Sequence, residues 1–298
     1  MDLERIVGWC LSLVLSPVKE LMNKAQQGGY AVPCFLFWDF ISLKGVLAAA
    51  EKTHSPVILG VYEGFWKYLP VEYYAAMGKS EAERSKVPTI LHLDHGSSID
   101  TVLKCIQIGF NSVMIDGSEL SLQDNISLTK ETVEICHKLN IGVEGELGHT
   151  GVRAPSHFSA DSIKTNPDEA ALYVKETGVD SLSVFVGNVS GVPEEASKID
   201  IELLEQIRRK VSTPLVLHGG TGVPSHQIKR AIEAGIACVH IGARLIEAYF
   251  DQANQVFSYS KAREDIYTAY DTFYARTVEE IKKIAEEKIK EFGSAEKA

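Results

Sequence analysis

An α/β fold, a single (β/α)8 TIM barrel spanning residues 1–298 with extra N-terminal and C-terminal helices, is predicted by three features of the sequence. Eight short runs rich in β-branched and aromatic residues alternate with helical patterns, and eight such units close a barrel. A closed barrel uses about 250 residues as one domain, so this length does not require two. No G-x-G-x-x-G motif follows the first strand, which disfavours the alternative, an open doubly wound sheet.

The expected elements follow one another in β-α order. Each expected strand is a short apolar run that ends in polar or glycine residues, and each expected helix carries apolar residues at helical spacing. The expected strands are 31–37, 57–61, 89–93, 112–115, 142–147, 180–185, 215–218 and 237–241. The expected helices between and after them are 42–52, 99–108, 127–139, 168–177, 201–210, 224–234 and 243–255.

Three segments lie outside this alternation. Residues 1–29 form a helical N-terminal segment, whose apolar stretch 6–18 is too short to span a bilayer and is expected to pack on the barrel or on another subunit. Residues 265–298 form a charged helical tail, with a C-cap expected at 292–294. Residues 149–167 read as a long loop after the fifth strand, and loops at that position are often substrate lids.

Charge and cysteine content exclude several classes of partner. Lys and Arg number 30 against 40 Asp and Glu, so the formal charge of −10, without a dense basic run, disfavours nucleic acid. The five cysteines are far apart and form no C-x-x-C pair, which disfavours a disulfide framework or a thiolate zinc site. We therefore expect a cytoplasmic protein with no membrane partner.

Polar residues gather at the expected strand ends, where a barrel places its active site. Glu144 and Glu146 share one face of the fifth strand, and a barrel interior holds two carboxylates only if a cation compensates them. A divalent metal ion held by His95 and His218 would do so, with a carboxylate or a further imidazole completing a tetrahedron. His240, on the eighth strand, is a candidate for that further imidazole.

A single histidine at a strand end is more often a hydrogen-bonded structural residue than a ligand. The coincidence of Asp94, His95, Glu146 and His218 on one rim is what favours a metal centre. The turn at 219–222 exposes backbone N–H groups ahead of a helix, which suits a phosphate group. Glycine-rich turns also serve as plain connections, so this turn alone does not establish a phosphate site.

Seven motifs, in order along the chain, resemble the class II, zinc-dependent fructose- and tagatose-bisphosphate aldolases. The resemblance runs from about residue 16 to residue 294. The motifs are YAVP at 30–33, SPVILG at 55–60, LHLDHG at 91–96, SVMIDGS at 112–118, VEGELG at 143–148, TGVDSL at 177–182 and LVLHGGTG at 215–222.

This resemblance implies a cofactor, a partner and residue roles. The cofactor would be Zn²⁺ or another divalent metal, the substrate a sugar or sugar phosphate, and the protein a homodimer or homotetramer. Asp94 would exchange a proton with the hydroxyl at the carbon–carbon bond that breaks, His95 and His218 would bind zinc, and Glu146 would be a further catalytic or metal carboxylate. Substrate or phosphate contacts would come from Gly219, Gly220, Thr221, Gly191, Ser190 and Arg153.

The sequence departs from the family pattern mainly at site positions. Ser190 stands where the family has a third histidine ligand, and a neutral hydroxyl is a poor zinc ligand. His240 replaces an asparagine that touches the ketose, and Arg153 lies in a lid that lacks the usual glutamate. Tyr62 and Ala243 replace two hydroxyl residues that contact phosphate.

These departures leave three interpretations. The first is a class II aldolase-like, metal-dependent lyase acting on a ketose or ketose phosphate other than ordinary fructose 1,6-bisphosphate, with His240 or His149 replacing the lost imidazole and Arg153 or Arg244 supplying charge. The second is a metal-dependent isomerase or epimerase on the same fold. The third is a non-catalytic paralogue that acts as a binding subunit. The survival of the Asp94, His95, Glu146 and His218 set favours the first.

Overall fold

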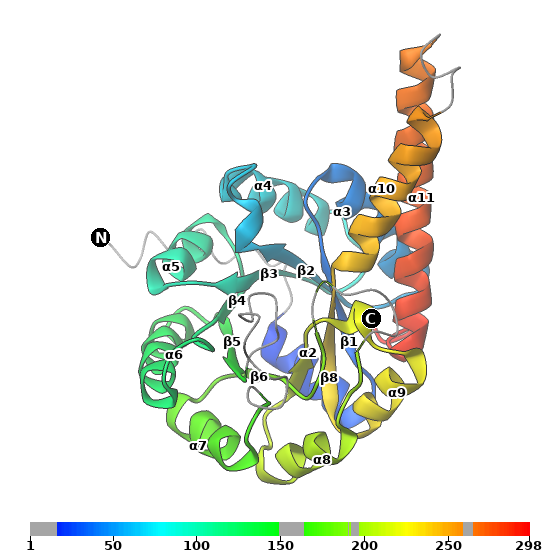
Figure 1. Ribbon diagram of the computed structural model, residues 1–298. Coiled ribbons are helices and arrows are strands. Elements are labelled where there is room, and N and C mark those ends of the chain that lie inside the picture. The colour runs from blue at the N-terminus through cyan, green and yellow to red at the C-terminus, as the bar shows by residue number, and fades with distance from the viewer. Residues whose placement is uncertain (1–16, 149–163, 190, 192–196, 259–264) are drawn as a thin grey trace.

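The computed structural model describes residues 17–148, 164–189, 191, 197–258 and 265–298. Eight parallel strands form a closed barrel in the order of the sequence, with helices around it, so the predicted TIM barrel is confirmed (Figure 1). Residues 6–16 of the predicted N-terminal apolar helix 6–18, together with Ser190, Arg153 and most of the expected lid, lie outside the described residues.

Each strand of the barrel coincides with one expected from the sequence, and the two ends of each agree within three residues. The strands are β1 (Val32–Leu36), β2 (Val57–Tyr62), β3 (Thr89–Gly96), β4 (Ser112–Ile115), β5 (Gly142–Leu147), β6 (Ser181–Val184), β7 (Leu215–Leu217) and β8 (Ile236–Ile241). The barrel closes between β8 and β1, where Cys34 is in register with His240. His240 is the next-to-last residue of β8, near the C-terminal ends of the strands that form the mouth of the barrel.

Ten α-helices are described, and one of them was not expected. They are α2 (Val18–Gly28), α3 (Phe40–Lys52), α4 (Val71–Ala82), α5 (Ile99–Ile108), α6 (Leu122–His137), α7 (Pro167–Thr177), α8 (Ile201–Lys210), α9 (Ser225–Glu233), α10 (Ala243–Phe257) and α11 (Ile266–Glu291). The additional helix is α4, which buries residues as different as Tyr74, Gly78 and Glu81 and so carries only a weak apolar stripe. The expected tail helix is confirmed as α11, followed by Gly293 in the left-handed conformation.

One end of the barrel is closed by apolar residues. Helix α2 lies across the end opposite the mouth, seen through the centre of the ring in Figure 1. Its buried face packs with interior residues of several strands, among them Cys34, Ile90 and Val216. Polar groups deep in the barrel are therefore cut off from water on this side and open only toward the C-terminal ends of the strands.

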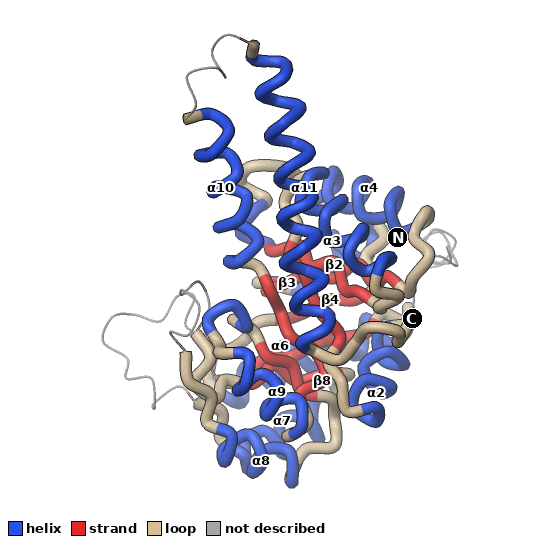
Figure 2. Tube along the Cα trace, turned by 90° about the vertical axis from the view of Figure 1, so that its right-hand side faces the viewer, coloured by secondary structure: helices blue, strands red, loops and turns tan. Residues whose placement is uncertain are grey.

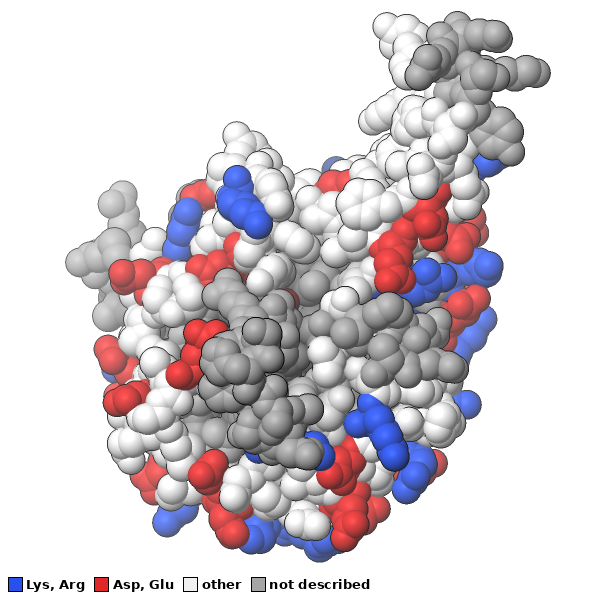
Figure 3. Space-filling view, in the orientation of Figure 1, with Lys and Arg blue, Asp and Glu red and all other residues white. Residues whose placement is uncertain are grey.

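Helices α10 and α11 form an arm that extends well beyond the barrel (Figures 1 and 2). Near the barrel the arm packs on α3, whereas farther out its aromatic side chains are exposed, including Phe250 at 66% and Tyr267 at 83%. Over the face in Figure 3, acidic and basic side chains of the described residues are interspersed, without the broad basic surface that nucleic acid needs. No helix among the described residues is long and apolar enough to cross a membrane.

Gly45 of α3 lies close against α11, and we expect Gly45→Ala to destabilise the protein. A Cβ there would lie 2.6 Å from Cγ2 of Ile281 and 2.9 Å from the backbone oxygen of Val278. Overpacking of this kind costs about 1–3 kcal/mol, more than the 0.5–1 kcal/mol or so gained in helix propensity. Urea unfolding measures the difference. Gly78→Ala in α4 is the matched control, because its Cβ would lie 2.8 Å from Cδ1 of Leu91, the end of a side chain and not backbone, so it should cost less than Gly45→Ala.

Candidate metal centre

Two imidazoles face each other at the mouth of the barrel. Nε2 of His95, in β3, lies 3.1 Å from Nδ1 of His218, which directly follows β7. The other nitrogen of each ring meets a carboxylate: Nδ1 of His95 lies 2.7 Å from Asp116, and Nε2 of His218 lies 2.8 Å from Glu144. If each outer nitrogen donates its proton to its carboxylate, both facing nitrogens present lone pairs to the same space.

This arrangement fits a divalent cation. Two lone pairs at 3.1 Å repel one another unless a proton or a metal ion lies between them, and a tetrahedral zinc site with Zn–N of about 2.0–2.1 Å has ligand edges of about 3.3 Å. A carboxylate behind each imidazole is the usual outer support of metal-binding histidines. Asp94 completes a group with His95 and His218 whose potential ligand atoms all lie within 4.8 Å of one another.

The local backbone explains how neighbouring residues of β3 both reach the centre. Successive residues of a regular strand point to opposite faces, so Asp94 and His95 would normally diverge. Here the β3–β4 register shifts between Leu93 and Gly96, and His95 has a left-handed φ of 54°. The irregularity turns the imidazole back toward the mouth, beside the carboxylate of Asp94.

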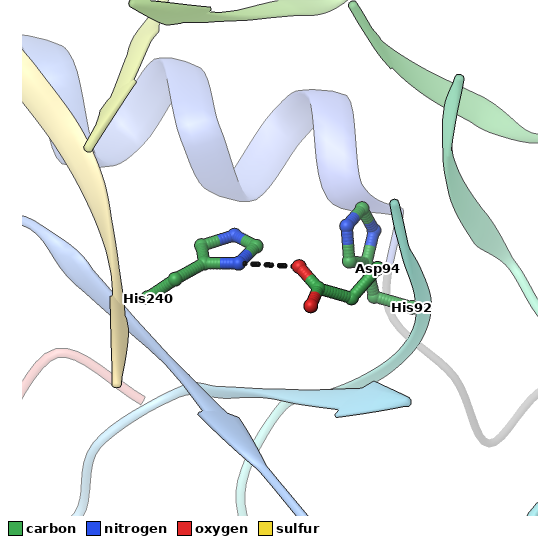
Figure 4. A group of neighbouring side chains, drawn as sticks. All are labelled: His92, Asp94 and His240. Atoms are coloured by element: carbon green, nitrogen blue, oxygen red, sulfur yellow. Dashed lines mark hydrogen bonds and ion pairs between the residues drawn. The ribbon is translucent and has the colours of Figure 1, made fainter. Parts of the chain in front are cut away.

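His240 joins the centre through Asp94. Its Nδ1 lies 3.0 Å from Oδ1 of Asp94, as drawn in Figure 4, and its ring stacks on that of His218 with centroids 3.9 Å apart. His240 belongs to two groups of potential metal ligands, one with His92 and Asp94 and the other with Glu144 and His218. The expected role of His240 as the replacement ligand beside His95 and His218 therefore stays a prediction.

Glu146 lies beside Nδ1 of His95, the ring nitrogen that faces away from His218. It is fully buried, and its Oε2 is 3.3 Å from Nδ1 of His95, the nitrogen that also meets Asp116. Asn125 donates a hydrogen bond to the Glu146 backbone oxygen, which holds this end of β5 in place. The three residues Glu146, Asp116 and His95 form a further group with ligand atoms within 4.8 Å, so Glu146 is placed to support the imidazole or to hold a cation.

The pKa values of Glu144, His95 and His218 indicate which of these side chains carry a proton. Burial, the neighbouring Asp94 and the nearby Glu146 raise the pKa of Glu144 well above its usual value. Burial lowers the pKa of His95, but Asp94, Asp116 and Glu146 outweigh it and raise the pKa well above normal. Burial, reinforced by His240 and His95, lowers the pKa of His218 well below normal. Without a metal, protons on His95 and Glu144 thus offset part of the negative charge.

The glycine-rich turn after β7 adopts a specific backbone rather than a generic loop. Gly219 has a φ of 66°, and a Cβ on Gly220 would lie 2.5 Å from Val239, so both positions favour glycine. The hydroxyl of Thr221 accepts a hydrogen bond from the backbone N–H of Arg244, at the start of α10. Gly191, by contrast, is exposed, with a φ of 73°. The phosphate-binding roles expected for these residues stay predictions.

Sequence reasoning missed several members of the centre. Asp116, which directly follows β4, belongs to the SVMIDGS motif, but the motif alone assigns it no role, although any carboxylate at a barrel strand end is a candidate. The contact of Glu144 with His218 was not foreseen, because strand periodicity places a residue on a face without naming its partner across the barrel. His92 lies two residues before Asp94, and this spacing places both on one face of β3.

Fold and centre together define a TIM-barrel protein with a polar centre of the kind that holds a divalent cation. The model of the family "fructose-bisphosphate aldolase class-II" matches residues 16–297, and the chain belongs to this family.

Relatives of known sequence or structure agree with this assignment. YdjI of Escherichia coli (strain K12) is 37% identical over 288 residues, which is 96% of this chain and 100% of YdjI. The crystal structure of the YdjI aldolase from Escherichia coli K12 has a TM-score of 0.83 at 35% identity, covering 95% of this chain and 99% of that chain. Fructose-bisphosphate aldolase (Fba) from Campylobacter jejuni shares the fold, with a TM-score of 0.81 at 24% identity and coverage of 94% and 95%.

Proposed function

We propose that the protein is a divalent-metal-dependent aldehyde-lyase that breaks or forms a carbon–carbon bond in a ketose or ketose phosphate. The facing pair of imidazoles, each supported by its own carboxylate, is the observation that carries this proposal. His95 and His218 would hold the ion, which is Zn²⁺ or a metal of similar preference. When bound, such an ion supplies Lewis-acid polarisation of a carbonyl group.

The remaining residues of the centre bind, orient or carry protons in this proposal. Asp94 is 3% exposed and contacts both His218 and His240. These contacts would hold its carboxylate beside a substrate carbonyl group that binds near His95 and His218. Its carboxylate would take the proton from the hydroxyl at the bond that breaks and return it in the reverse direction. Asp116 and Glu144 would fix the ring orientations of His95 and His218.

Ordinary fructose or tagatose bisphosphate should be turned over negligibly. Ala243 has no hydroxyl to offer a phosphate group, and the ring of Tyr62 is held edge-on between His95 and Phe65, at 6.1 and 5.4 Å between centroids. A charge-assisted hydrogen bond contributes about 1.5–3 kcal/mol, so losing two weakens binding by about 10²–10⁴-fold. Coupled-enzyme assays of both bisphosphates with the metal-loaded protein measure this. Turnover at an ordinary enzymatic rate of about 10 s⁻¹ would contradict the expectation.

The proposed function is tested by metal analysis combined with a substrate screen. The purified protein is analysed for bound metal, loaded with Zn²⁺ or Co²⁺, and incubated with phosphorylated and free ketoses and with pairs of aldehydes and ketoses. Carbon–carbon cleavage or condensation that disappears with a chelator supports the lyase. Conversion of one sugar into another without carbon–carbon cleavage would indicate an isomerase or epimerase. If metal is bound but no substrate is turned over, the protein would be a binding subunit.

The exposed arm supports the expected homo-oligomer. Its outer part presents Phe250, Tyr267 and Tyr270 to solvent, and a cluster of large apolar side chains of this kind is typical of a protein interface. We expect a dimer or tetramer in light scattering after size exclusion, and dissociation when Tyr267→Glu and Tyr270→Glu are combined. Tyr68→Glu is the control, because Tyr68 is also exposed, at 77%, but lies outside the arm. A monomeric wild type would contradict this expectation.

A further inference from the structure

A second group of potential ligands lies in the barrel interior beside the His95–His218 pair. It consists of His92 and Asp94 of β3 and His240 of β8, all of them buried, with one ligand atom from each within 4.8 Å of the others (Figure 4). His240 stands where the resemblance implies an asparagine, so this chain offers an imidazole that the family pattern does not. We propose that His92, Asp94 and His240 form a second binding site for a divalent cation.

The state of His92 is the first argument for this site. Its side chain is only 2% exposed, and Nδ1 lies 2.7 Å from the hydroxyl of Ser112, on β4. Nε2, on the other side of the ring, has no hydrogen-bond partner in the described part of the chain. A buried polar nitrogen without a partner is unfavourable, and a bound cation would supply the missing partner.

The geometry of His240 is the second argument. The distance of 3.0 Å between its Nδ1 and Oδ1 of Asp94 is close to the ligand edge of about 3.3 Å in a tetrahedral zinc site. The ring of His92 approaches that of His240 edge-on, with centroids 5.6 Å apart.

Formal charge is the third argument. The side chains of the whole centre include the four carboxylates of Asp94, Asp116, Glu144 and Glu146, all close to the four imidazoles. When all four carboxylates are ionised and the imidazoles are neutral, a single divalent ion leaves two negative charges in or beside the barrel interior, whereas a second ion neutralises them. Asp94 belongs to both groups of potential ligands.

Metal binding without substrate tests this site. Dialysis of the full-length protein against excess Zn²⁺ above neutral pH, followed by metal analysis, should give two ions per chain. His92→Gln should lower this to one ion without loss of the ion at His95 and His218. Ser112→Ala is the matched control: it removes only the partner of Nδ1 and should keep two ions, with about 10-fold weaker binding of one. The exposed His226→Ala should change nothing.

Anomalous diffraction at the zinc edge locates the ions independently of folding defects in any variant. A peak between the side chains of His92, Asp94 and His240, in addition to the one between His95 and His218, is the expected result. A single peak in wild-type crystals soaked in Zn²⁺, with only water beside His92, would overturn the proposal. So would two ions per chain in His92→Gln. Neither outcome affects the proposed lyase function, which requires only the ion at His95 and His218.

Discussion

Asp94→Asn should abolish turnover of any substrate that the screen identifies while the fold and the ion at His95 and His218 are retained. The amide has the size of the carboxylate and still contacts His240, but it cannot take up and return a proton. Loss of a positioned acid–base group lowers kcat by about 10²–10⁴-fold. Steady-state kinetics should show the loss in kcat and in kcat/KM together, as expected when an interaction of the transition state is removed.

The companion variant for this experiment is Asp116→Asn. Asp116 contacts His95 rather than the position expected for substrate, so it should act by weakening metal binding, and excess metal should restore much of the activity. Excess metal should not rescue Asp94→Asn. Activity that survives Asp94→Asn would remove Asp94 from the mechanism.

His218→Ala should remove the metal at the His95–His218 pair. The substitution deletes one of two facing nitrogens and leaves Glu144 buried with its main polar partner gone. Changes in the outer carboxylates of metal sites cost about 10–100-fold in affinity, and loss of a ligand itself should cost more than 100-fold. Competition with a chromophoric chelator measures the affinity.

Two further variants show whether the loss is specific. Glu144→Gln keeps the imidazole of His218 but weakens its support, so its affinity should lie between those of the wild type and His218→Ala. His226→Ala removes an exposed imidazole on α9 and should leave the affinity unchanged. Unaltered metal binding in His218→Ala would contradict the assignment of His95 and His218 as a metal centre, and it would also contradict the proposed lyase function.

The barrel could be predicted because each of its strands is a short apolar run with a clear end. The exceptions have physical reasons. Helix α4 lacks a strong apolar stripe, since Tyr74 and Glu81 are both buried on it, and periodicity alone does not identify such a helix. Strand β3 continues to Gly96 rather than Leu93, because Asp94 still pairs with Tyr62 of β2 and Gly96 with Ile115 of β4 despite the irregular backbone at His95.

The candidate site could be predicted only in part. Asp94, His95, Glu146 and His218 follow from the rule that barrel chemistry lies at strand ends, and the structure brings all four together. Which carboxylate faces which imidazole could not be predicted, because it depends on barrel register and on the irregular backbone at His95. The pairings of Asp116 with His95 and of Glu144 with His218 are of this kind.

At His95, the left-handed backbone conformation lowers stability, whereas the side chain is needed for the proposed chemistry. An L-residue with a side chain in this conformation costs roughly 1–2 kcal/mol, whereas glycine adopts it freely. His95→Gly would relieve that strain, but it would also delete the proposed metal ligand and the imidazole that contacts Asp116. Selection for heat resistance at this position must therefore score metal retention together with melting temperature.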